Sequence, residues 1–194
     1  MFGIIAEDPS DVEALKVIVR RLKDDTSLPI LAKGYSGCSE MLRKGSSQFR
    51  LFAKRGVEKY IICYDSDRAD PEQRRQEAKT KIWDDANIHG DCCVVVPVQE
   101  LEAWILADIG AVSNIIKSWS PSSTSIPNPE TIPDPKEHLE KLSRINHRPR
   151  YSHAIHNSRV AQYLDLNLVA KKCPSFSILK DFIIPPKDKT ESIA

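Results

Sequence analysis

Residues 57–67, VEKYIICYDSD, decide the fold because they combine a buried strand with two closely spaced acids. The apolar run at residues 60–64 is rich in β-branched and aromatic residues, which is typical of a strand buried on both faces. Asp65 and Asp67 would then follow its carboxyl end, where open parallel sheets bind ligands. Side chains two apart along a strand point the same way, so both carboxylates are expected to face one cation. Alternatively, the acids belong to a solvated loop that leads to a helix cap at Asp70.

A second acid occupies the matching place after the first apolar run. Residues 2–6 end at Glu7, directly before a helix whose start we assign to a capping box of Ser10 and Glu13. In a βαβ arrangement this strand end shares a sheet edge with the two later aspartates, so three carboxylates are expected to converge. Such convergence requires a cation.

A third junction of this kind follows the apolar run CCVVVPV at residues 92–98. The run leads directly into QELEAWILAD at residues 99–108, which we expect to be helical. Glu100 and Glu102 arrive at this strand end and could complete a metal site with the earlier acids. The alternative is an acid pair that suits the positive end of a helix dipole.

Cations follow the acids on a helix that we expect to begin with Asp70 and Pro71. Arg68 is nearest the acids and either holds a scissile phosphate or neutralises a neighbouring aspartate as an ion pair. An earlier basic helix at residues 39–55, interrupted by Gly45, is expected to be a solvated face. The other cations assigned to substrate binding are Arg74 and Arg75, in the helix after Asp70, and Arg148 and Arg150, in the polar stretch at residues 146–159.

These motifs resemble the Toprim superfamily, in which a Glu follows the first strand and a later hydrophobic strand ends in DxD. GIIAEDPSD, YIICYDSDR and VVVPVQELEAWILAD are similar to small stand-alone Toprim-like proteins catalogued as a domain of unknown function. The resemblance covers residues 3–108 well and the C-terminal third loosely. It is strongest over ELEAW, which favours Glu102 as the functional acid of its pair. Relatives often have Gly after the first acid, whereas Asp8 and Pro9 follow Glu7 here.

The resemblance also implies chemistry and partners. It implies a Mg²⁺-binding acidic site, with Mn²⁺ as a substitute, and phosphodiester chemistry. Several relatives occur in phage-defence operons beside an ABC-type ATPase, so an ABC-type or AAA ATPase is an expected partner besides nucleic acid.

Length and composition limit the number of domains and the class of protein. The 194 residues suit one domain with a modest extension, and a net charge of +1 argues against a strongly basic nucleic-acid coat. No apolar stretch approaches the ~20 residues of a membrane span, so we expect a cytoplasmic protein without membrane contact. The five cysteines show no CxxC spacing and are expected to be free thiols. Homo-oligomerisation is left open.

The sequence thus predicts an α/β fold with a Toprim-like, Rossmann-like, mostly parallel sheet flanked by helices. This domain spans residues 1–118. A Pro-rich loop (119–135), a helical C-terminal extension (136–184) and a disordered tail (185–194) are expected to follow.

The predicted function is a Mg²⁺-dependent nuclease of DNA or RNA that acts in anti-phage defence with a partner ATPase. The alternative is a non-catalytic interaction subunit that keeps the fold. A receiver-like phosphoacceptor is a weaker third option. The residues assigned to catalysis are Glu7, Asp65, Asp67 and Glu102, and those assigned to the metal are the same four and Glu100.

Overall fold

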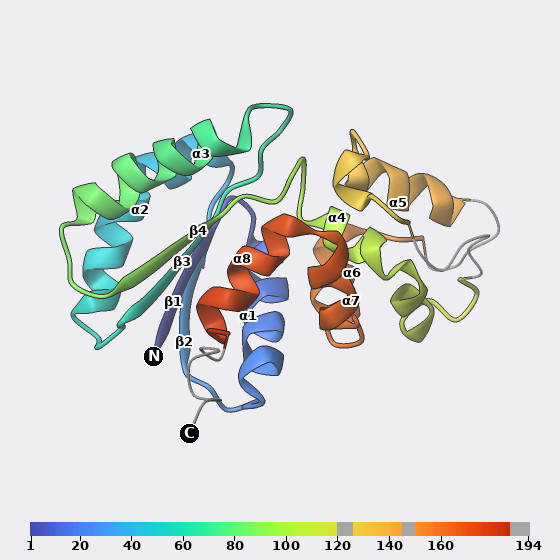
Figure 1. Ribbon diagram of the computed structural model, residues 1–194, viewed down its shortest axis with the longest axis horizontal. Helices are drawn as coiled ribbons and strands as arrows, with labels where there is room; N and C mark the ends of the chain where they lie inside the picture. The colour runs from blue at the N-terminus through green and yellow to red at the C-terminus, as the bar shows by residue number, and fades with distance from the viewer. Residues whose placement is uncertain (120–125, 145–149, 187–194) are drawn as a thin grey trace, which may run out of the picture.

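The computed structural model describes residues 1–119, 126–144 and 150–186. Its centre is a four-stranded sheet in the order β2-β1-β3-β4, in which every neighbouring pair is parallel (Figure 1). This confirms the Rossmann-like α/β class. The strands are β1 (Phe2–Ala6), β2 (Ile30–Gly34), β3 (Lys59–Cys63) and β4 (Asp91–Val95).

The central strands are buried on both sides, as their unbroken apolar runs predict. Alternate side chains enter two separate cores, with Ile4 and Ile61 in one and Ile5 and Ile62 in the other. A sheet with two apolar faces needs helices on both, and Figure 1 shows this three-layer arrangement.

Helices cover both faces of the sheet. Helices α1 (Pro9–Lys23) and α8 (Pro174–Ile183) lie on one face, and α2 (Cys38–Ala53) and α3 (Pro71–Ala78) lie on the other (Figure 1). The remaining helical segments are η1 (Lys79–Asp84), a π-helix that continues α3; α4 (Glu102–Ala107); the 3₁₀ turns η2 (Ile109–Asn114) and η3 (Pro129–Thr131); and α5 (Pro135–Arg144), α6 (His153–Val160) and α7 (Leu166–Lys172).

The predicted capping box at the start of α1 is wrong. The N-cap is Asp8, whose Oδ1 accepts a hydrogen bond from the amide of Ser10 at 2.6 Å, while Glu13 pairs with Lys16 instead. Pro9 is the reason, because a proline is best placed in the first helical turn and so moves the cap to the preceding residue. The Asp8–Pro9 pair after Glu7 therefore starts the helix.

The expected interruption of α2 at Gly45 is also wrong. The helix is continuous, and Gly45 is buried where an added Cβ would lie 3.0 Å from side-chain atoms of both Ile5 and Ile82. Here the glycine permits close packing of α2 between the sheet and η1.

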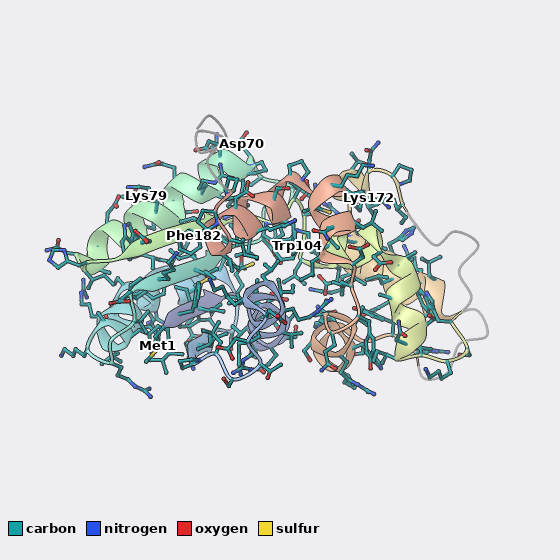
Figure 2. The ribbon with its side chains drawn as sticks, turned by 60° about the horizontal axis from the view of Figure 1, so that its bottom comes forward. Met1, Asp70, Lys79, Trp104, Lys172 and Phe182 are labelled. Carbon is teal, nitrogen blue, oxygen red and sulfur yellow. The ribbon has the colours of Figure 1, made fainter. Side chains whose placement is uncertain are left out.

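The C-terminal helices share a core with the sheet. Trp104 of α4 lies in the interior (Figure 2), where its Nε1 donates to Ser175 Oγ at 2.8 Å and its ring packs edge-on against Phe176. Arg21 of α1 donates to the carbonyl oxygens of Ala161 and Leu164 at 2.7 and 2.8 Å. The C-terminal helices therefore contribute to the same core as the strands that carry the acids.

Parts of two predictions lie outside the described residues, namely residues 120–125 of the Pro-rich loop and 187–194 of the tail. Within the part that the structure describes, no helix combines the length and apolar character of a membrane span.

Candidate acidic site

The acids meet at the topological switch point of the sheet. The connection after β1 leads through α1 to β2 on one side, whereas the connection after β3 leads through α3 to β4 on the other side. The carboxyl ends of β1 and β3 therefore form the switch point at which open α/β sheets bind ligands. Glu7 directly follows β1, and Asp65 comes two residues after β3. The amide of Asp65 donates to Glu7 Oε1 at 3.0 Å, so the two predicted residues are in contact.

Asp65 points inward. Its Oδ1 is fully buried and has no hydrogen-bond partner among the described residues. Burial raises the pKa of Asp65 well above its usual range, and the nearby charges of Asp11, Glu102 and Glu7 raise it further. When Asp65 is ionised, its Oδ1 therefore lacks the hydrogen-bond donor that normally compensates a buried carboxylate oxygen, although the charge of Lys136 acts on Asp65.

Glu7 is half-buried, and its surroundings also disfavour the ionised form of its carboxyl group. Burial, followed by the charge of Asp67, raises the pKa of Glu7 to about 7, although the amide of Asp65 and the charge of Arg74 oppose this shift. The carboxyl thus exchanges its proton near neutral pH, which suits acid-base chemistry.

Asp11 belongs to this cluster, and the sequence interpretation missed it. It lies in the first turn of α1 and is only 7% exposed. Burial, and next the charge of Glu102, raises the pKa of Asp11 well above its usual range. Its position four residues after Glu7 was the available signal, but an acid in a first helical turn is ordinarily explained by the helix dipole.

Glu102 joins the cluster from α4. Its side chain is 1% exposed, and Oε1 accepts a hydrogen bond from Asn157 Nδ2 of α6 at 3.0 Å. Burial raises the pKa of Glu102, whereas Lys136 and the bond from Asn157 lower it. Tyr151 in turn donates to Asn157 Oδ1, so a buried polar network connects this acid to the C-terminal helices.

Lys136, at the start of α5, is a cation of the site that sequence reasoning also missed. Burial disfavours its charge, yet Glu102, Glu100 and Asp11 raise the pKa of Lys136 above its usual value. Its Nζ lies 3.4 Å from Glu100 Oε1, and its amide donates to Glu100 Oε2 at 2.9 Å. Glu100 therefore caps α5 and pairs with this lysine.

The expectation that Asp65 and Asp67 face the same way by strand alternation is wrong. The strand ends at Cys63, and Asp67 has a left-handed backbone with φ of 46°, so the extended geometry behind that argument is lost. The Asp67 side chain is exposed, while its amide donates to the carbonyl of Gln99 at 3.3 Å. Asp67 acts on both Glu7 and Asp65 through its charge, from a turn rather than from the same strand face as Asp65.

The predicted cations separate into different environments. Arg68 forms a surface ion pair with Asp134 at 2.7 Å. Asp134 is neither a phosphate nor one of the neighbouring aspartates, the two partners expected from the sequence. Arg74 faces the site, with its guanidinium 4.8 Å from the centre of the Tyr64 ring. Arg75 pairs with Glu72 and Arg150 is exposed, while Arg148 lies outside the described residues.

The donor chemistry of the cluster fits a hard divalent cation. Glu7, Asp11, Asp65 and Glu102 offer carboxylate oxygens, the ligands that Mg²⁺ prefers, and a cation would satisfy the orphaned Oδ1 of Asp65. As placed, however, no three His, Cys, Asp or Glu side chains within residues 1–119, 126–144 and 150–186 form a ready metal-binding group.

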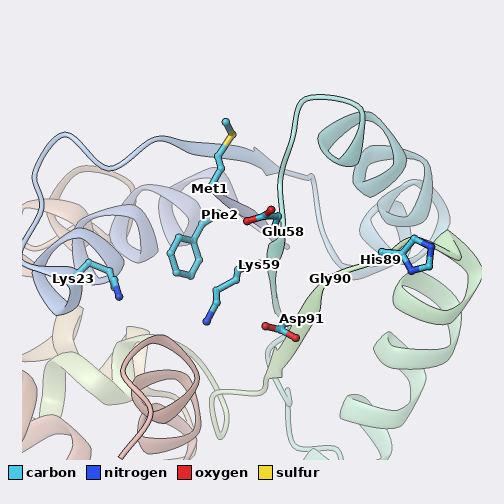
Figure 3. Close-up of a pocket in the computed structure, with 8 residues that line it drawn as sticks. All are labelled: Met1, Phe2, Lys23, Glu58, Lys59, His89, Gly90 and Asp91. Carbon is cyan, nitrogen blue, oxygen red and sulfur yellow. The ribbon is translucent and has the colours of Figure 1, made fainter.

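A separate pocket lies at the opposite, amino-terminal edge of the sheet (Figure 3). It is lined by Phe2, Lys59 and Asp91 at the starts of three strands, together with Lys23 and Glu58. Its acids are exposed and accompanied by lysines, so it does not share the buried negative charge of the carboxyl edge.

Comparison with known proteins gives one family match. The model described as Domain of unknown function (DUF4276) matches residues 6–183, a span that includes every acid of the cluster and ends in α8. Neither the curated proteins nor the solved structures give a match. Because the matched span covers most of the chain, the protein belongs to the DUF4276 family.

Proposed function

We propose that this protein is a Mg²⁺-dependent phosphodiesterase that cleaves DNA or RNA, with Mn²⁺ as a substitute. The observation that carries the proposal is the convergence of Glu7, Asp11, Asp65 and Glu102 at the switch point, with a buried Asp65 oxygen left unpaired. The resemblance to Toprim proteins supports the same chemistry.

The residues divide into two roles. Asp65, Asp11 and Glu102 would hold the cation, which when bound offsets negative charge on the phosphate. Glu7 serves as the general base that accepts the proton of the attacking water, because its pKa of about 7 leaves part of its population ionised at neutral pH. Arg74, which acts electrostatically on Glu7, would contact a phosphate beside the acids.

The biological setting that we propose is anti-phage defence together with an ABC-type or AAA ATPase. The support for this setting is the resemblance alone. Homo-oligomerisation is compatible with it.

The first test is metal binding. Calorimetric titration of Mg²⁺ and Mn²⁺ into the wild type should give a saturable isotherm that Asp65→Asn loses, because the orphaned carboxylate becomes a neutral amide. Asp91→Asn, at the other edge of the sheet, should bind as the wild type does. Equal isotherms for all three proteins would remove the metal site from the proposal.

The second test is cleavage of plasmid, single-stranded DNA and RNA with either metal, with and without the neighbouring gene's product. We expect products from at least one substrate. Intact substrates under every condition would reject the nuclease.

A second function is favoured by the contacts that the acids make with the C-terminal helices. Glu100 caps α5 and Glu102 binds Asn157 of α6, as expected if the acids hold the fold of a non-catalytic interaction subunit. In that case Glu102→Gln and Asp65→Asn change the free energy of unfolding, but no divalent cation stabilises the wild type.

A further inference from the structure

A basic pocket adjoins the acidic site between α2 and α3. Its cavity volume of about 430 Å³ lies within the range of small-ligand sites. Three cations, Arg43, Arg74 and Lys81, and one carboxylate, Glu77, are among the residues that line it. Its local charge is therefore positive, in contrast to the neighbouring acidic site.

We call this cavity between α2 and α3 the Arg43 pocket. The negative charge of its carboxylate, Glu77, is already compensated by neighbouring groups. Glu77 receives an ion pair from Lys81 at 2.7 Å and a hydrogen bond from the Tyr64 hydroxyl at 2.9 Å. Arg74 lies 3.6 Å from the same carboxylate and also contacts the hydroxyl and ring of Tyr64. Glu77 thus holds two of the cations in place and leaves a net positive pocket.

Arg43 differs from these two cations. Its side chain is exposed, and no ion pair of Arg43 occurs within the described ranges. An arginine without a carboxylate partner at the rim of a positive pocket keeps its five donors available for an anion.

The pocket and the acidic site share a wall. Tyr64 lines the pocket and directly precedes Asp65, and Arg74 lines the pocket while its charge acts on Glu7. The amide of Gly37, which precedes α2, donates to the carbonyl of Glu7 at 3.0 Å. A polyanion held at the acids therefore has a positive pocket directly beside it.

We propose that the Arg43 pocket binds a phosphodiester group of the nucleic-acid strand, next to the group that is cleaved. This inference rests on the proposed function and adds to it a subsite that positions the strand. Arg43 contacts the phosphate oxygens, and Lys81 does so with the donors that its bond to Glu77 leaves free. Arg74 stays fixed on Tyr64 between the pocket and the acids. Phosphate contacts position a strand without reading its sequence, so the subsite should accept many sequences.

The test measures binding without cleavage. A fluorescent single strand of about 12 nucleotides, within the range of single-strand site sizes, is titrated in EDTA at several KCl concentrations. Arg43→Gln should weaken binding at low salt and reduce the slope of log K against log salt by about 0.7, the value for one phosphate contact on a single strand. Lys81→Gln should act in the same direction.

Lys44→Gln is the matched control, because Lys44 follows Arg43 on α2 but pairs with Glu40 and does not line the pocket. It should keep the wild-type affinity and slope. If Arg43→Gln and Lys81→Gln also keep them, the subsite is rejected. If inorganic phosphate saturates the pocket while the strand binds all variants equally, the strand assignment is rejected in favour of free phosphate. Because EDTA removes metal chemistry, these results are separate from a failure of the nuclease in Mg²⁺ assays.

Discussion

The two edges of the sheet carry the same residue types in opposite physical situations. At the amino edge, Glu58 and Asp91 are exposed and lie with Lys23 and Lys59 around an open pocket (Figure 3). At the carboxyl edge, the charges of Glu7, Asp11, Asp65 and Glu102 act on one another around the switch point, and burial raises the pKa of each.

This contrast shows that burial, rather than the number of acids, distinguishes a candidate site from an ordinary surface. Water compensates an exposed carboxylate, whereas a buried one needs a donor, a counter-ion or a proton. At the carboxyl edge, Lys136 supplies one counter-ion and Asn157 one donor, while Asp65 Oδ1 has no hydrogen-bond partner among the described residues.

The largest expected effect is a loss of nucleic-acid cleavage that a substitution at the carboxyl edge causes and a matched substitution at the amino edge does not. Glu7→Gln should retain the fold but reduce the rate of nucleic-acid cleavage roughly a hundredfold, because the amide cannot accept the proton of the nucleophile. Glu58→Gln is the matched change at the amino edge and should cleave at the wild-type rate. Single-turnover cleavage in Mg²⁺ measures both, and equal rates for the two variants would remove the assigned role of Glu7.

A second effect concerns Lys136, the cation at the carboxyl edge, and the free energy of unfolding. Lys136→Met should lower the free energy of unfolding by about 1–3 kcal/mol, the scale for leaving a buried polar partner uncompensated. The lysine side chain is 33% exposed, so solvent screening favours the lower end of this range.

The control for Lys136 is Lys23→Met at the amino edge, which should stay within about 0.5 kcal/mol of the wild type, as surface substitutions usually do. Urea denaturation measures both variants. Mg²⁺ should raise the melting temperature of Lys136→Met more than that of the wild type, because the acids have lost their internal cation. A loss as small as that of Lys23→Met would show that Lys136 does not compensate the cluster.

A third effect is a pH dependence. The pKa of Glu7 is about 7 in the folded chain against 4.5 for the free group, so the folded state binds more protons between these values. The contribution of Glu7 to stability is therefore fully present below pH 4.5 and is lost as the pH rises through 7.

Glu7→Gln removes this contribution. Between pH 4.5 and 7, the free energy of unfolding of the Glu7→Gln variant should therefore fall less than that of the wild type. Glu58→Gln should retain the wild-type dependence. Urea midpoints at a series of pH values measure the difference. Parallel curves for wild type and Glu7→Gln would contradict the raised pKa.

The sequence predicted well where the signal was local. The strands β1 and β3 were expected from their apolar runs, and Asp70 with Pro71 marked the start of α3, where the Asp70 carboxylate accepts from two backbone amides. Prediction failed where two local signals competed, as at Asp8 and Ser10, since both residue types can cap a helix and only the position of Pro9 separates them.

By itself, the sequence determined that acids stand at the ends of buried parallel strands, because burial and strand direction follow from short apolar runs. Only the tertiary structure decided which charges meet. Asp11 joins the cluster because α1 packs on the sheet, and Lys136 and Asn157 join it because the C-terminal helices pack beside α4. Asp67 leaves the strand geometry because the chain turns after β3, although its charge still acts on Asp65. Apart from the local turn at Asp67, these outcomes depend on contacts between segments far apart in the chain, which no local pattern encodes.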